Sequence, residues 1–212
     1  MTTSAPPGNR FERRRAETRA ALVRAARQLL AETGETGASI QVIAERADVG
    51  FGSFYNHFAS KQELFEAAVE EVLEEHGAML DELTADLADP AEVFAAALRI
   101  TARFPRTHPE LAEIFARTGL RYLTAPSGLA PRALRDLERA RDAGRLSFRD
   151  PTVALACTGG ALLGVLHVAL ETRAPSAVDR LADELTLNLL RMFGLSAEDA
   201  GEVVGRPLPT SA

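Results

Sequence analysis

Apolar residues recur every three or four positions along nearly the whole chain. Strand-like alternation between turn signals is absent, whereas proline repeatedly stands where a helix would begin. The sequence therefore predicts an all-α fold. With 212 residues the chain is long enough for one or two domains whose apolar core needs neither disulfides nor a metal.

This spacing, together with capping signals, predicts about nine helices. The first four are expected at about residues 13–32, 40–47, 51–58 and 61–87. Ser39 is the expected N-cap of the second, and Ser60 with Glu63 forms a capping box before the fourth. The next four are expected at about 90–104, 109–122, 131–143 and 151–172. Ser176 is the expected cap of a last helix ending near Phe193, and residues 194–212 are expected to be a frayed tail.

The charges of the chain are unevenly distributed. Its net charge is −6, yet residues 1–61 carry nine basic groups against six acidic ones, and residues 62–212 carry fifteen against twenty-four. Seven arginines lie between Arg10 and Arg27. This asymmetry indicates a basic contact surface attached to an acidic body.

Other features of the sequence indicate the cellular compartment of the protein. A single cysteine, Cys157, excludes a disulfide framework and a cysteine-ligated zinc site, and is typical of a reducing cytosol. The N-terminus has no apolar run of the kind found in secretory signals. Residues 153–170 are uncharged and long enough for a membrane span, but alanine, glycine and His167 dilute their apolar content. We interpret this segment as a helix buried in protein and predict a cytoplasmic protein without a membrane partner.

Residues 38–64 have the pattern of a helix-turn-helix, with two short helices separated by the turn Asp48–Gly50. Any tight helical corner would share this periodicity. The second of these helices, however, contains no acidic residue, and hydroxyl, amide and imidazole groups cover the sides opposite Phe54 and Phe58. Such groups bind phosphates and base edges, so the pattern indicates DNA binding. Asn56 is the best candidate for reading a base, because an amide can pair bidentately with adenine.

Four stretches carry a more specific pattern: Ser39–Ala44, Ala47–Val49, Gly52–Phe58 and Ser60–Leu64. Together they closely resemble the DNA-binding domain of the tetracycline-repressor (TetR) family, over about residues 14–66. The rest of the chain matches only in the number, length and order of its helices. The resemblance implies an N-terminal three-helix domain with a helix-turn-helix, followed by a larger helical ligand-binding and dimerisation domain. It also implies a homodimeric repressor that a small molecule releases from its operator, which a twofold dimer makes palindromic.

The expected organisation is a flexible basic arm at 1–12, a DNA-binding domain at 13–60, an effector-binding and dimerisation domain at 61–193, and the tail at 194–212. Carried over by position, the resemblance implies that Ser39, Gln41 and Lys61 contact phosphates. The DNA-binding residues expected as a set are Ser39, Gln41, Phe51, Gly52, Ser53, Tyr55, Asn56, His57 and Lys61. The sequence departs from the family's pattern at Asp48, Gly50 and Phe51. The arginines at 10–15 could reach the DNA backbone or a minor groove, or could be merely solvated.

A strip of small residues, Ala156, Gly160 and Gly164, follows the uncharged helix at a spacing of four, where another backbone can approach closely. Together with the resemblance, this strip predicts a homodimer interface. Packing within one chain must also use some of this surface. The interface residues expected are Ala156, Gly160, Gly164, Leu181, Leu185 and Leu189.

The effector pocket is expected among the fourth to eighth helices. Its candidate residues are His76, Met79, Phe94, Phe104, His108, Phe115 and Tyr122. Aromatic residues at helical spacing are more often core than pocket, because packing alone requires them. No helix carries a metal-binding pair of the type His-x-x-x-His, so we expect no metal and no cofactor, and a mostly apolar or aromatic effector.

Enzymatic function is not predicted. The sequence contains no P-loop, no nucleophile elbow and no dinucleotide fingerprint. Two alternatives to a repressor stay open at this point. One is a helical small-molecule-binding or scaffold protein with a vestigial DNA-binding domain, and the other is a transcriptional activator of the same fold.

Overall fold

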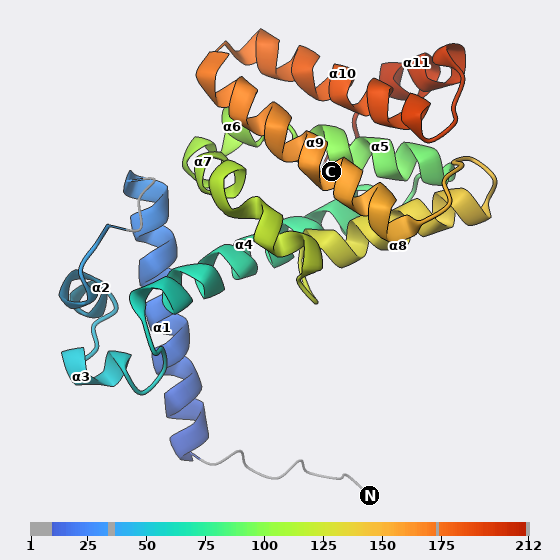
Figure 1. Cartoon of the computed structure of the whole chain (residues 1–212). Coiled ribbons are helices and arrows are strands. Elements are labelled where there is room, and N and C mark those ends of the chain that lie inside the picture. The colour runs from blue at the N-terminus through green and yellow to red at the C-terminus, as the bar shows by residue number, and fades with distance from the viewer. Residues whose placement is uncertain (1–9, 34–36, 173, 211–212) are drawn as a thin grey trace, which may run out of the picture. The chain divides into compact units, whose positions relative to one another are not determined.

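The computed structural model describes residues 10–33, 37–172 and 174–210, and these residues form eleven α-helices and one 3-10 helix with no β-strand (Figure 1). The predicted all-α fold is confirmed. The chain divides into two compact units, the first ending at Val69 and the second beginning at Glu70. The division lies inside α4 (Lys61–Leu83), further along the chain than the expected boundary at residue 60.

The first unit contains α1 (Arg10–Thr33), α2 (Ile40–Arg46), α3 (Phe51–Phe54) and the beginning of α4. α2 packs against both α1 and α3. Large side chains that are almost completely buried in this unit are Leu22, Leu30, Ile43, Phe54, Phe58 and Leu64. These residues include the apolar stripe of α1 and the two phenylalanines that the sequence places on one side of the third helix.

α1 begins earlier than expected. Residues 10–12, which the sequence analysis assigned to a flexible arm, form its first turn. An ion pair of 3.6 Å between Arg13 and Glu17 links one turn to the next on the helix surface. The rest of the expected arm, residues 1–9, lies outside the described residues.

The two helices of the helix-turn-helix are short because the chain turns tightly around them. Ser39 caps α2 as predicted, its hydroxyl oxygen accepting a hydrogen bond from the Val42 N–H at 3.2 Å. Asp48, in the turn, has a φ of +53°, a left-handed conformation that aspartate tolerates better than most residues. α3 ends at Phe54 instead of Phe58, and the chain continues in turns closed by bonds such as His57 N–H to Phe54 carbonyl.

The expected capping box before α4 forms in a modified version. The Ser60 hydroxyl oxygen accepts from the Glu63 N–H at 3.1 Å, as predicted. The Glu63 carboxylate, however, accepts from the N–H of Ala59 at 2.6 Å rather than from that of Ser60. Both exposed amides near the helix start are thereby satisfied.

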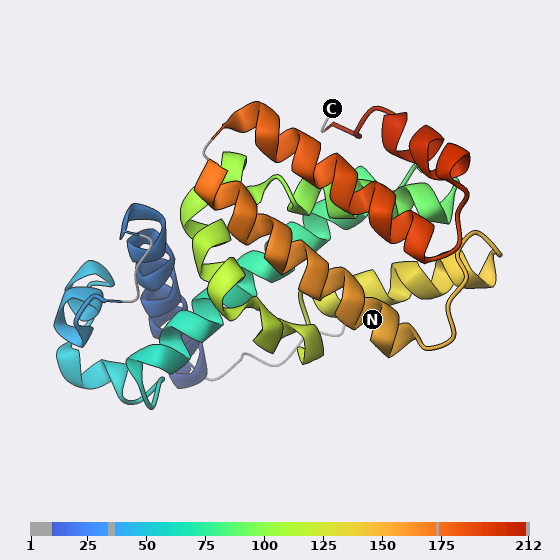
Figure 2. The ribbon, with the colours of Figure 1, turned by 45° about the horizontal axis from the view of Figure 1, so that its top comes forward.

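The second unit contains the remaining helices. They are α5 (Pro90–Thr101), α6 (Phe104–Thr107), α7 (Pro109–Thr118), the 3-10 helix η1 (Gly119–Thr124), α8 (Leu129–Asp142), α9 (Pro151–Thr172), α10 (Pro175–Met192) and α11 (Ala197–Gly205). α9 packs against α7, η1, α8 and α10, and α5 packs against α8, α10 and α11 (Figure 2). α9 is thus the central helix of this unit.

Three expectations for this unit are wrong. α8 begins at Leu129, before Pro131, and α10 begins at Pro175 after Ala174, without a cap from Ser176. Residues 197–205, expected to lie in a frayed tail, form α11, because Ala200 and Val203 are buried and provide an apolar face. Beyond α11, the Arg206 side chain forms an ion pair with Glu92 on α5.

α9 is the one helix among the described residues that is long and apolar enough to cross a bilayer. Eight of its residues are buried within the second unit. At Gly159 an added Cβ would lie 2.2 Å from the Leu123 side chain, so η1 approaches the backbone of α9 closely there. This glycine therefore serves packing within the chain.

Candidate DNA-binding surface and effector cavity

The side chains predicted to meet DNA occupy the exposed side of α3 and the turn after it. Phe51 and Tyr55 are 54% and 56% exposed, and their rings meet edge to face at 6.0 Å. Asn56 is exposed, and Ser53 and His57 are half-buried. Two large aromatic side chains held out in solvent are unusual on a surface without a partner. Below them the Phe54 and Phe58 side chains anchor the segment in the core of the unit.

The predicted phosphate contacts lie on neighbouring elements of the same unit. Gln41 is exposed on α2, where its amide donates a 3.0 Å hydrogen bond to the Glu45 carboxylate. Lys61, half-buried at the start of α4, donates to the Gly37 carbonyl at 3.3 Å. Ser39 is exposed but uses its hydroxyl oxygen to cap α2. The side chains of Gln41 and Lys61 must therefore leave or share their present partners to bind a phosphate.

Arginines of α1 lie close to this surface. The Arg15 guanidinium donates to the Asn56 carbonyl at 3.5 Å, and the Arg19 guanidinium lies 5.0 Å from the centre of the Phe58 ring. Burial, followed by the charges of Arg15 and Arg19, lowers the pKa of His57 below its ordinary value. At neutral pH His57 is thus mainly a neutral hydrogen-bonding group, while the arginines supply the positive charge.

A cavity lies in the second unit among α4, α5, α7, η1, α8 and α9, with a volume of about 80 Å³. One water molecule needs roughly 10–15 Å³ by this measure, so the cavity has room for a small organic molecule. Its wall is mainly apolar, formed by residues such as Leu73, Leu98, Leu155 and Leu162. A mostly apolar cavity with a few polar groups is typical of small-molecule sites.

The expected effector residues divide into two groups. Phe94, Phe115 and Tyr122 line the cavity, whereas His76, Met79, Phe104 and His108 do not. His76 instead stacks on Phe104 at 4.3 Å and contacts the Thr101 hydroxyl at 3.1 Å. Burial, with a smaller contribution from the charge of His108, lowers the pKa of His76 to about 4. His76, Phe104 and His108 form a separate cluster, because α4 turns His76 away from the stripe that carries Leu73 and Leu80, whereas Met79 is exposed.

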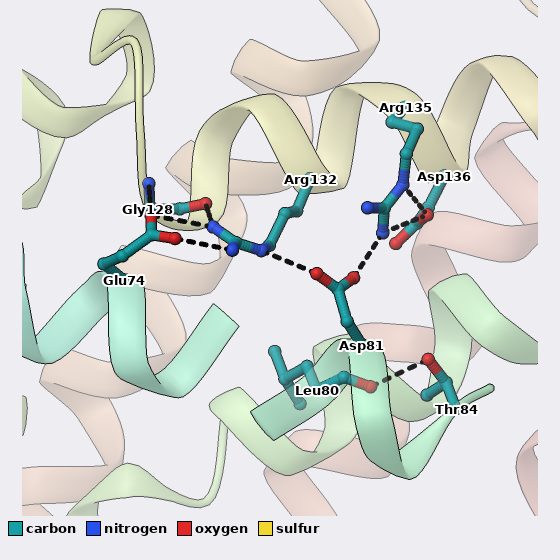
Figure 3. Close-up of polar contacts among 8 residues, drawn as sticks. All are labelled: Glu74, Leu80, Asp81, Thr84, Gly128, Arg132, Arg135 and Asp136. Atoms are coloured by element: carbon teal, nitrogen blue, oxygen red, sulfur yellow. Dashed lines mark hydrogen bonds and ion pairs between the residues drawn. The ribbon is translucent and has the colours of Figure 1, made fainter. Parts of the chain in front are cut away.

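The polar part of the cavity wall was not predicted. It consists of Asp81 from α4, and Arg132 and Asp136 from α8, with Thr84, Thr101 and Thr158. Figure 3 shows Asp81 between the guanidinium groups of Arg132 and Arg135, which donate to its carboxylate at 2.8 and 2.6 Å. A carboxylate one position after a buried leucine of α4, and an Arg-x-x-x-Asp pair on α8, were the signals available in the sequence.

Arg132 has a second carboxylate partner at the edge of this cluster. Its guanidinium donates to both oxygens of Glu74, at 2.6 and 2.9 Å, and the Gly128 N–H donates to the same carboxylate at 2.7 Å. These hydrogen bonds from Arg132 and Gly128 hold the pKa of Glu74 at about 2. Burial alone would raise the pKa of Asp81, but the bonds from Arg135 and Arg132 outweigh it and lower that pKa.

The predicted dimer residues also divide. Ala156, Gly160 and Gly164 lie exposed along one side of α9, and an added Cβ at either glycine would meet nothing within 4 Å. Leu185 and Leu189 are instead buried within the subunit, and Leu181 is half-buried. The same side of α9 exposes two large apolar residues, Val153 at 57% and Val168 at 49%.

With this geometry described, comparison with known proteins identifies the family. Residues 22–68 match the family model of bacterial regulatory proteins of the tetR family, and residues 89–206 match that of the tetracyclin repressor-like C-terminal domain. The chain belongs to the TetR family. It is therefore a DNA-binding, ligand-responsive transcriptional regulator, and its family is not one of enzymes.

Among solved TetR-family structures, the chain is similar to RolR in complex with its ligand resorcinol, with 36% identity and a TM-score of 0.82 over 94% of this chain and 98% of RolR. RolR without ligand is 34% identical, with a TM-score of 0.78, and the match covers 90% of this chain and 98% of RolR. SmeT, the repressor of the multidrug efflux pump SmeDEF of Stenotrophomonas maltophilia, is 26% identical, with a TM-score of 0.65. The match covers 91% of this chain and 100% of SmeT. Comparison with curated protein sequences gives no match.

Proposed function

We propose that this TetR-family protein is a cytoplasmic, homodimeric repressor that binds a palindromic operator and is released from it by a small aromatic molecule. The observation that carries the proposal is the cavity in the second unit, in a chain 36% identical to RolR, whose structure holds resorcinol. Resorcinol, a benzene ring with two hydroxyl groups, matches an apolar cavity with a few polar groups on its wall.

Operator binding is assigned to the exposed side of α3. Phe51, Gly52, Ser53, Tyr55, Asn56 and His57 offer apolar, hydroxyl, amide and imidazole groups for base edges and phosphates. Ser39, Gln41 and Lys61 flank them as backbone contacts, the last at a helix N-terminus. The positive charge near α1 attracts DNA to this surface, although the protein as a whole is acidic.

Dimerisation is assigned to the exposed side of α9. Small residues at Ala156, Gly160 and Gly164 allow a second backbone to approach, and Val153 and Val168 supply apolar area at its ends. A twofold dimer presents two α3 helices and so requires a site with two related halves.

Release by the effector is assigned to α4, which belongs to both units and carries Leu73, Leu80 and Asp81 on the cavity wall. An effector releases DNA only if it binds more tightly to the form with low DNA affinity. By linkage, operator DNA must then weaken effector binding by the same factor.

An electrophoretic mobility shift with DNA from upstream of the protein's own coding sequence tests the proposal. We expect retardation of this DNA, none of an unrelated duplex of equal length, and loss of the complex on adding resorcinol. Binding of resorcinol by a protein that retards no DNA would support a small-molecule-binding protein with a vestigial DNA-binding domain. Transcription in vitro that rises when the protein is added would support an activator.

A further inference from the structure

The threonine hydroxyls on the cavity wall have already donated their protons. Thr84 Oγ1 donates to the Leu80 carbonyl at 2.8 Å, Thr101 Oγ1 to the Ala97 carbonyl at 2.8 Å, and Thr158 Oγ1 to the Ala154 carbonyl at 2.9 Å. A hydroxyl has a single proton, so each of these oxygens retains only lone pairs. Toward the cavity, these side chains can accept a hydrogen bond but cannot donate one.

Asp136 adds a stronger acceptor. Its side chain is 6% exposed, and it lines the cavity. Oδ1 accepts a hydrogen bond of 2.9 Å from Arg135, whereas Oδ2 accepts none from the residues that the structure describes (Figure 3). Since no fully buried side-chain oxygen of the described residues lacks a partner, Oδ2 is not fully enclosed by protein, and a molecule in contact with it can donate to it. Burial raises the pKa of Asp136 more than the hydrogen bond from Arg135 lowers it.

Both neighbouring guanidinium groups bind acceptors of the protein. Arg132 donates to Glu74, Asp81 and the Gly128 carbonyl, and Arg135 donates to Asp81 and Asp136. Of the charged residues that line the cavity, Asp81 and Asp136 are acidic and Arg132 is basic, so the wall itself carries an excess of negative charge. Arg139, further along α8, also lowers the pKa of Asp136. Its effect is smaller than that of burial, which raises this pKa.

We propose that the cavity selects uncharged aromatic molecules that donate hydrogen bonds, and rejects aromatic carboxylates of similar size. A phenolic hydroxyl can donate to Asp136 Oδ2 and satisfy it. A carboxylate has no proton to donate at neutral pH and would add a negative charge beside Asp136 and Asp81. This inference rests on the proposed function, because it names the chemical class of that effector.

Isothermal titration calorimetry of the full chain at pH 7.5 tests the selectivity with two matched pairs, resorcinol against 3-hydroxybenzoate and phenol against benzoate. In each pair one member carries a hydroxyl where the other carries a carboxylate. We expect the neutral member to bind about 10- to 100-fold more tightly, the range for one hydrogen bond to a charged group. A carboxylate that binds as tightly as its neutral partner overturns the inference, and so does a failure of all four compounds to bind.

The variant Asp136→Asn keeps the side-chain size, removes the charge and introduces an amide that can donate. It should weaken the binding of resorcinol about tenfold or more and reduce the ratio between the affinities for resorcinol and 3-hydroxybenzoate. Asp142→Asn, on the same helix but exposed and outside the cavity wall, is the matched control and should leave both affinities unchanged. If the ratio of the two affinities is the same in Asp136→Asn as in the unmodified protein, the inference is overturned as well.

The mobility shift separates this inference from the proposed function. If resorcinol binds with the expected preference but leaves the operator complex intact, the effector role fails and the selectivity stands. If resorcinol and 3-hydroxybenzoate bind equally and both release the operator, the effector role stands and the selectivity fails. The comparison on the unmodified protein does not depend on whether a variant folds.

Discussion

Arg132 on α8 donates a 2.8 Å hydrogen bond to Asp81 on α4, across a separation of 51 residues in the chain. The same guanidinium binds Glu74, so one arginine joins two turns of α4 to the start of α8. These bonds fix the wall of the cavity at the point where its polar groups lie. The interaction therefore links the stability of the second unit to the geometry of its cavity.

Replacing Arg132 with methionine should destabilise the protein, because Asp81 and Glu74 each lose a partner while the apolar stem is kept. Removing one member of a fully buried pair costs about 3–5 kcal/mol. Because this cluster is partly exposed, we expect the free energy of unfolding in urea to fall by about 1–3 kcal/mol. Arg141→Met, on the same helix, loses an ion pair with the adjacent Asp142 and a contact with the Phe148 ring, and should cost less than about 1 kcal/mol. Equal losses in the two variants would contradict this assignment.

Acid should weaken the same link. The pKa of Glu74 is about 2 in the folded protein, below its ordinary value of 4.5. A carboxylate with a lowered pKa stabilises the fold above its unfolded pKa and loses this contribution as the pH falls through the folded pKa. We expect the urea midpoint to decline between pH 4.5 and about 2, and Glu74→Gln should make this decline shallower. Parallel curves for the two proteins would show that Glu74 does not carry the effect.

Two substitutions should separate base reading from phosphate binding. Asn56→Ala should relax sequence preference, with a loss of about 1–3 kcal/mol of discrimination at one position of each half-site. Lys61→Ala should weaken all sites alike and reduce the slope of log affinity against log salt by about 1. A binding selection on randomised operators, repeated at several salt concentrations, measures both. Since Lys61 also contacts the Gly37 carbonyl, urea unfolding should accompany the assay. Full specificity in Asn56→Ala would show that another side chain reads the base.

The dimer assignment is tested by Gly160→Leu. An added Cβ at Gly160 meets nothing within 4 Å in the subunit, so the substitution should leave the subunit folded and disturb only a second chain packed on α9. Gly201→Leu, also a helical glycine with open space around it, is the matched control on α11. In sedimentation equilibrium we expect a dimer for the unmodified protein and the control, and a shift toward monomer for Gly160→Leu. A monomeric unmodified protein at micromolar concentration would remove the basis for this interface.

The turn of the helix-turn-helix should gain stability from Asp48→Gly. Asp48 has a φ of +53°, in the left-handed region that costs a typical L-residue about 1–2 kcal/mol and glycine almost nothing. Because aspartate tolerates this conformation, we expect a gain of at most about 1 kcal/mol, whereas Asp48→Val should lose at least as much. Thermal unfolding of the three proteins gives their order of stability. An Asp48→Val variant more stable than the unmodified protein would contradict this prediction.

The features that the sequence determined by itself are local ones. Ser39 caps the helix that follows it, and α9 extends from Pro151 to Thr172, both as predicted. These elements depend on groups within one or two helical turns, so nearby residues decide them. The helix-turn-helix is of the same kind, because its turn, its caps and its buried Phe54 all lie within 27 residues, from Ala38 to Leu64.

Tertiary structure decided which side of each helix faces which neighbour. His76 and Leu80 are one turn apart on α4, yet His76 packs on Phe104 while Leu80 lines the cavity. Gly159 lies against Leu123, whereas its neighbour Gly160 is open. Periodicity indicates that a helix has an apolar side but does not fix its partner, because several rotations bury similar apolar area. The pairing of Asp81 with Arg132 arises only when α4 and α8 meet, since that contact joins residues far apart in the chain.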